Sequence, residues 1–130
     1  MATIFSRIIA GEIPCYIIAE DEHFFAFLDI NPLSKGHTLV VPKLELDYLF
    51  ELDDETLSQM IVFAKKVAKG MEQAIPCKRI GLTVIGLEVP HAHIHLIPIN
   101  SESDMNFSNK KLTFNNEEMT SIAKQISEQI

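Results

Sequence analysis

The 130-residue chain is poor in several of the residues on which common binding sites depend. It has only two cysteines, Cys15 and Cys77, which lie far apart and form no C-x-x-C pair. This spacing argues against a structural zinc site and favours a reducing compartment. The 11 basic residues face 18 acidic ones, which gives a formal net charge of −7. Binding to duplex nucleic acid or to a membrane surface needs a basic face, so neither is an expected partner.

Long apolar runs are also missing from the start of the chain. The N-terminal segment MATIFSRIIAGEIP is interrupted by Arg7, Gly11, Glu12 and Pro14. We therefore expect neither a signal peptide nor a membrane-spanning segment there, and the cytoplasm is the expected location. The hydrophobic fraction of 47% excludes a disordered chain and is enough for one core. Length and composition together predict a single domain over residues 1–130.

Hydrophobic periodicity predicts three helices. A short helix follows Thr3 as N-cap and stops at Gly11, and a long helix runs from Asp53 to just before Pro76. A last helix begins near Asn115, which is followed by a glutamate placed for a capping box. The stripe expected to be buried on the long helix comprises Leu57, Met60, Ile61, Ala64, Val67, Ala68, Met71 and Ile75.

Apolar segments bounded by turn residues predict five strands. Two short strands flank the Asp21-Glu22 turn within residues 15–30, and a buried strand, HTLVVP, ends at Pro42. Two further strands, RIGLTVIG and HAHIHLIPI, are expected to be joined by a very short connection. The expected fold class is α+β, an antiparallel sheet with helices packed on it.

Three of the five histidines fall at alternate positions in the segment PHAHIHLIP, residues 90–98. Side chains alternate between the faces of a strand, so His91, His93 and His95 are expected on one face. The residues between them are apolar and are expected to face the core. Three histidines on a single face indicate a functional site.

Two kinds of site fit this spacing. An H-x-H pair on a strand is a known zinc arrangement, and His37 could supply a further ligand. Alternatively, a neutral imidazole attacks phosphorus while its neighbours hold the phosphate oxygens. The spacing of the histidines does not choose between these two readings.

The residues around the run carry a resemblance to a known family. HAHIHLI matches the pattern His-φ-His-φ-His-φ-φ, where φ is apolar, and resembles the histidine triad (HIT) superfamily. Residues 3–43 resemble the N-terminal half of the Hint branch nearly position by position, and the resemblance covers most of residues 3–99. It implies an antiparallel HIT-like sheet with one long helix, a homodimer, and no metal or other cofactor.

The resemblance also implies roles for four histidines. His93 would be the nucleophile that attacks the α-phosphorus of a nucleotide and forms a nucleotidyl-histidine. The carbonyl of His91 would bind the second ring nitrogen of His93 and fix its tautomer. His95 would contact the phosphate and assist departure of the leaving group, and His37 would support His91.

The resemblance further implies a nucleoside site. Asp29 would accept both ribose hydroxyls, which need an acceptor. A purine needs flat apolar walls, and the residues implied for this slot are Ile30, Phe5, Ile8 and Leu28.

The segment VIGLEVPH departs from the family pattern. Leu87 replaces the usual glutamine, and several residues of the preceding loop are missing, so a contact to the phosphate region is absent. Either the site is weakened, or the backbone N–H groups of Glu88 and Val89 bind the phosphate instead. Ser6 also stands where some bacterial relatives have a zinc-binding cysteine, so that zinc site is not expected.

These features predict a hydrolase of purine nucleoside 5′-phosphoramidates or related nucleotide conjugates. The same His93 chemistry would serve a dinucleoside polyphosphate hydrolase, which stays open as an alternative. A nucleotide-binding regulatory module with little turnover is the alternative outside the enzymes.

Overall fold

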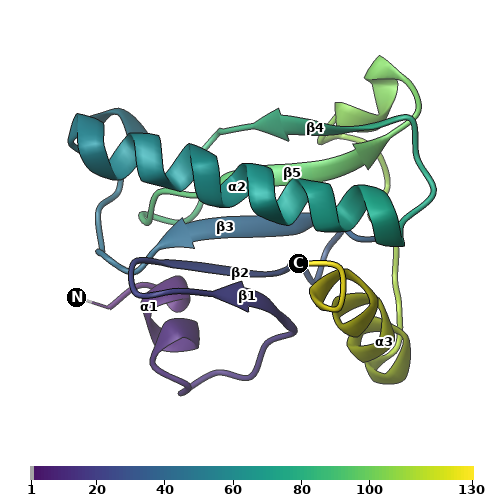
Figure 1. Cartoon of the computed structure of the whole chain (residues 1–130), viewed down its shortest axis with the longest axis horizontal. Helices are drawn as coiled ribbons and strands as arrows, with labels where there is room; N and C mark the ends of the chain where they lie inside the picture. Colours follow the sequence, from purple (N-terminus) through teal and green to yellow (C-terminus); the bar gives the residue numbers. More distant parts are fainter. Residues whose placement is uncertain (1) are drawn as a thin grey trace.

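The computed structural model describes residues 2–130, which form one five-stranded antiparallel sheet with helices packed on it (Figure 1). The strand order is β1-β2-β3-β5-β4, and every neighbouring pair is antiparallel. The strands are β1 (Ile17–Glu20), β2 (Phe24–Leu28), β3 (Thr38–Pro42), β4 (Arg79–Thr83) and β5 (Ile94–Ile99). The helices are α1 (Ile4–Ile9), α2 (Asp54–Ala74), α3 (Asn116–Ser127) and the short 3-10 turns η1 (Leu49–Glu51) and η2 (Glu102–Met105). The predicted α+β class is confirmed.

Helix α2 lies across one face of the sheet, and α3 packs beside it near β1 (Figure 1). The main core fills the space between these helices and the sheet. The side chains of Met60, Val67 and Met71 are fully buried there, as the stripe predicts. Ile61 does not belong to this core, because its side chain is 45% exposed, and Phe63 takes that place instead.

A second, smaller cluster covers the opposite face of the sheet. It consists of Phe25 and Phe27 from β2, Leu39 and Val41 from β3, and Phe5 from α1. Successive residues of a strand point to opposite faces, so β2 contributes to both clusters and its five residues are all buried. This second face is the one that carries the histidines.

The predicted helix ends are confirmed. Thr3 caps α1 by accepting the backbone N–H of Ser6, and Asp53 caps α2 in the same way. Asn115 and Glu118 form the expected capping box at the start of α3. Each cap stabilises its helix by roughly 1 kcal/mol.

The predicted connection between the last two strands was too short. Strand β4 ends at Thr83 and β5 begins only at Ile94, so a loop of residues 84–93 joins them. Gly86 has φ of +71° in this loop, and Pro90 lacks an N–H for a strand ladder. His91 and His93 therefore precede the strand instead of lying within it.

None of the helices in the described part of the chain combines the length and apolar character needed to cross a membrane.

Candidate active site

The His91 ring is completely buried and bonded at both nitrogens. Its Nε2 lies 2.8 Å from the carbonyl oxygen of Pro42, which can only accept, so Nε2 carries the proton. Its Nδ1 is hydrogen-bonded to the Thr3 hydroxyl at 2.8 Å. His91 is thus held in one orientation between the end of β3 and the N-cap of α1.

His93 is oriented by the backbone of His91. The His93 Nδ1 lies 2.7 Å from the His91 carbonyl oxygen and must donate to it. In the neutral ring this leaves the lone pair on Nε2. The Phe5 ring packs edge-on against His93, with 5.0 Å between centroids, and also meets His91 at 5.8 Å. The two histidines therefore lie on one side, as the alternation predicts.

His37 and His95 form a second pair whose protons can be assigned. The backbone N–H of Leu33 donates to His37 Nδ1 at 3.0 Å, so that nitrogen carries no proton. His37 Nε2 then holds the proton and donates to His95 Nδ1, also at 3.0 Å. His95 accepts at Nδ1, and its own proton must therefore lie on Nε2.

This pairing corrects the role implied for His37. Leu39 pairs with His95 in the sheet register, so His37, two residues earlier, lies diagonally beside His95 on the same face. His37 bonds His95 and not His91, whose two nitrogens are used by Thr3 and Pro42.

The four rings leave two nitrogens free of protein partners among the described residues. These are Nε2 of His93, which carries a lone pair, and Nε2 of His95, which carries a proton. The ring centroids of His93 and His95 lie 5.0 Å apart. The site therefore presents one nucleophilic nitrogen beside one hydrogen-bond donor.

Burial keeps these imidazoles neutral. It is the main cause that lowers the pKa of His37 to about 3 and that of His95 to about 4. Neighbouring histidines lower both values further. Burial also lowers the pKa of His93, although the hydrogen bond to the His91 carbonyl opposes this shift. At neutral pH all three are uncharged.

Asp29 lies beside His37 at the end of β2. One carboxylate oxygen accepts the backbone N–H of Asn31 at 2.8 Å, and the other lies 3.6 Å from His37 Nε2. Since His37 is neutral, this second contact is not an ion pair. Burial raises the pKa of Asp29, while the Asn31 hydrogen bond and the charge of Lys111 lower it. The side chain is 19% exposed, so part of it faces solvent.

The residues expected to line the base slot are only partly brought together. Phe5 and Ile8 belong to the cluster on the histidine face. The Leu28 side chain does not join them: it is 2% exposed and points into the main core under the helices. The prediction that Leu28 lines the base slot was wrong. Side chains of β2 alternate between the two faces of the sheet, and Leu28 shares a face with Phe24 and Ala26.

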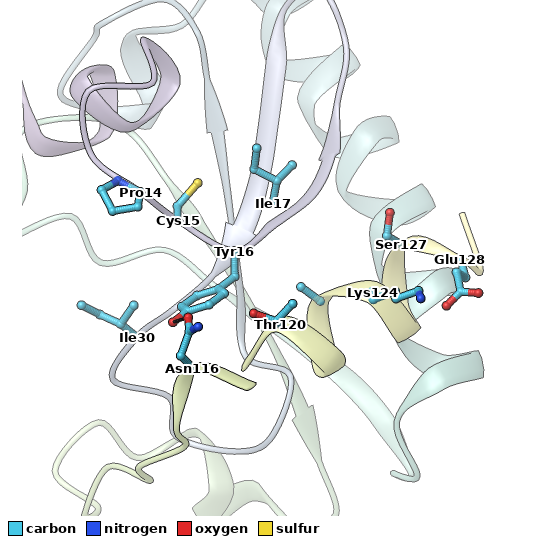
Figure 2. Close-up of a pocket in the computed structure, with 11 residues that line it drawn as sticks. Pro14, Cys15, Tyr16, Ile17, Ile30, Asn116, Thr120, Lys124, Ser127 and Glu128 are labelled. Carbon is cyan, nitrogen blue, oxygen red and sulfur yellow. Dashed lines mark hydrogen bonds between the residues drawn. The ribbon is translucent and has the colours of Figure 1, made fainter. Parts of the chain in front are cut away.

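Ile30 is 69% exposed and lies on a separate groove of about 650 Å³. Figure 2 shows this groove between α3 and the chain leading into β1, with Tyr16 and Asn116 in contact below it. The Tyr16 hydroxyl donates to the Asn116 side chain at 2.8 Å. No histidine lines this groove, so it is separate from the site of the imidazoles.

The loop before the histidines is largely exposed to solvent. Leu87 is 88% exposed, and Glu88 is exposed as well. Val89 is half-buried against the cluster on the histidine face, and its carbonyl accepts the His91 N–H at 2.8 Å. The Glu88 charge raises the pKa of Asp29, which indicates that this loop passes near the carboxylate.

Three ligand atoms in the site could hold a metal ion. One atom each from Asp29, His37 and His95 lies within 4.8 Å of the other two. The Leu33 N–H, however, forces a proton onto His37 Nε2, the nitrogen that would have to bind the ion. The hydrogen bonds of the pair therefore account for this arrangement without a metal.

Sequence reasoning missed the polar network behind His91. Glu45 accepts the Thr3 backbone N–H at 2.7 Å and is also bonded by the Ser6 hydroxyl. These bonds lower the pKa of Glu45 and tie the first turn of α1 to the Thr3 hydroxyl that holds His91. Glu45 is exposed in a loop and has no sequence signal that marks it.

The fold and the paired imidazoles define a histidine-based site, and comparisons with known proteins assign the family. The family model described as HIT domain matches residues 10–102. Adenosine 5′-monophosphoramidase hnt1 of Schizosaccharomyces pombe is 36% identical over 133 residues, covering 100% of this chain and 99% of the relative. Protein hit of Bacillus subtilis is 39% identical over 108 residues, covering 78% and 73%.

A solved structure agrees with these relatives. A Hit-like protein from Bartonella henselae superposes with a TM-score of 0.84 at 32% identity, covering 98% of this chain and 96% of the other. The chain belongs to the HIT family.

Proposed function

We propose that this HIT-family hydrolase cleaves purine nucleoside 5′-phosphoramidates, or related conjugates, at the α-phosphorus through a nucleotidyl-histidine on His93. The observation that carries the proposal is the pair of free nitrogens, a lone pair on His93 Nε2 beside an N–H on His95 Nε2. A nucleophile next to a donor for a phosphate oxygen is what in-line attack on phosphorus needs. Two relatives named adenosine 5′-monophosphoramidase support this class of substrate.

The proposed reaction has two balanced steps. First, a bond forms between His93 Nε2 and phosphorus while the phosphorus–nitrogen bond to the amine breaks, and the amine takes its proton from solvent. The His91 carbonyl stabilises the positive charge that develops on the His93 ring. Water then attacks phosphorus and gives one proton to solvent, the bond to His93 breaks with its electron pair returning to Nε2, and the monophosphate leaves. His95 donates a hydrogen bond to a phosphate oxygen throughout and does not transfer a proton, because its pKa of about 4 leaves the ring without a second proton at neutral pH.

The proposed nucleoside site lies on the Asp29 side of the imidazoles. Asp29 has a partly exposed side chain, one carboxylate oxygen of which makes no hydrogen bond with the described residues and would accept the ribose hydroxyls. Phe5 and Ile8 offer apolar contacts on the α1 side, and Ile30 follows Asp29 as an exposed apolar residue.

The experiment that tests this function is a turnover panel. It compares adenosine and guanosine 5′-phosphoramidates with diadenosine polyphosphates, using the purified chain. Release of monophosphate from the phosphoramidates supports the proposal, and preference for the dinucleotides supports the alternative hydrolase. Binding of monophosphate without any turnover would leave only a binding module. A parallel sample dialysed against a chelator is expected to keep its rate, whereas a loss restored by Zn²⁺ would favour metal catalysis.

We also propose a homodimer through the open edge of β4, which ends the sheet. Apolar side chains on and just after this strand are exposed, namely Leu82, Val84 and Ile85. A second copy pairing along this edge would cover them and remove the unpaired edge. Sedimentation velocity measures this association directly.

The environment of His93 predicts how the rate falls as the pH is lowered. Only the neutral ring carries the Nε2 lone pair, and a lowered pKa keeps the ring neutral to lower pH. We therefore expect kcat/KM to be lost only as the pH falls below about 6.5, the ordinary pKa of histidine. The measurement uses an aryl ester of adenosine 5′-phosphate, whose leaving group needs no proton. A midpoint at or above the ordinary value contradicts the expectation.

A further inference from the structure

We propose that Lys111, in the segment between η2 and α3, is a specificity-determining residue that binds the phosphate of the nucleotide. The proposal rests on the function proposed above and identifies the positive charge of that site. The segment concerned is Asn106–Leu112, which has a polar sequence and forms no helix or strand.

This segment packs directly on the imidazoles. The Phe107 ring lies edge-on to the His95 ring with 4.9 Å between centroids, and 6.2 Å from the His37 ring. At its other end, the backbone N–H of Leu112 donates to the Pro32 carbonyl at 2.9 Å, in the loop that follows Asp29. The segment therefore spans from His95 to the neighbourhood of Asp29.

Lys111 is held over this segment. Its half-buried side chain donates to the carbonyl oxygens of Phe107 and Asn109, and its Nζ lies 5.8 Å from the centroid of the Phe107 ring. An ammonium group has three donors, so one remains for a ligand. The Lys111 charge also lowers the pKa values of Asp29 and His37, consistent with its position beside them.

A phosphate would gain from this charge, because the other side chains of the site carry no positive charge at neutral pH. His37, His93 and His95 are neutral at neutral pH, and the nearby Asp29 and Glu88 carboxylates repel an anion. In the described part of the chain, Lys111 is the only cation that shifts the pKa values of these groups. A charge-assisted contact in a half-buried site is strong enough to decide binding.

The test separates phosphate recognition from folding. Calorimetry compares AMP with adenosine on the wild type, Lys111→Met and Lys110→Met, the last an exposed neighbouring lysine that serves as control. We expect Lys111→Met to weaken AMP about tenfold, as for a lost charged hydrogen bond, and to leave adenosine unchanged. Lys110→Met should change neither, and Lys111→Arg should restore most of the AMP affinity.

Three results would overturn the inference. Equal AMP affinity in the wild type and Lys111→Met removes Lys111 from the site but leaves the proposed function intact. An equal loss for AMP and adenosine shows that the lysine only supports the fold. Failure of the wild type itself to bind AMP removes the proposed function, and the inference with it.

Discussion

Replacing His93 by alanine is expected to lower turnover at least about a thousandfold, since removal of a covalent nucleophile typically costs this much or more. The physical reason is that His93 Nε2 is the one free lone pair among the four imidazoles of the site. AMP should still bind, because Asp29 and the donor on His95 remain. The measurement is the steady-state rate on adenosine 5′-phosphoramidate.

A matched control comes from His23→Ala, since His23 is exposed in the turn before β2 and does not belong to the site described above. It should keep the wild-type rate. Wild type denatured during turnover at alkaline pH, where a phosphorus–nitrogen bond to histidine survives, should also gain the mass of one nucleotidyl group, and His93→Ala should not. Turnover of His93→Ala near the wild-type value would rule out the covalent mechanism.

The local parts of the fold could be predicted because their signals lie within a few residues. Thr3, Asp53 and Asn115 are caps whose partners are three residues away. The alternation around His93 also places its neighbour Ala92 in the main core, as expected. Such features follow from the period of the helix or strand alone.

Other features depend on contacts between distant segments. All five residues of β2 are apolar and buried, so no polar alternation shows that Leu28 faces the helices. The bond from His37 to His95 depends on the pairing of Leu39 with His95, a register that joins residues 56 positions apart. The Asn106–Leu112 segment has no periodicity, so the packing of Phe107 on His95 could not be foreseen.

The two halves of the site therefore differ in how they are specified. The nucleophile is oriented by its own neighbour, the His91 carbonyl, and is a local feature. The donor on His95 is fixed through His37 and the Leu33 N–H, which both belong to the loop that precedes β3. A nucleotide bridging His93 and Asp29 would contact both halves.

Replacing Asp29 by alanine is expected to weaken AMP binding about tenfold or more, because a charge-assisted hydrogen bond contributes about 1.5–3 kcal/mol. One carboxylate oxygen of Asp29 accepts the Asn31 N–H, and the other makes no hydrogen bond with the described residues. If Asp29 binds the ribose, 2′-deoxy-AMP should lose less affinity from the mutation than AMP does. Calorimetry with both ligands on both proteins measures this difference.

The control for Asp29→Ala must account for the turn contact that this variant loses, namely the hydrogen bond from the Asn31 N–H. Asp21 makes the same kind of contact, with its carboxylate accepting the His23 and Phe24 N–H groups, and it lies in the exposed turn between β1 and β2. Asp21→Ala therefore removes a similar turn contact and should leave AMP affinity unchanged. Equal losses for AMP and 2′-deoxy-AMP on Asp29→Ala would mean that Asp29 shapes the loop before His37 and does not bind the 2′-hydroxyl.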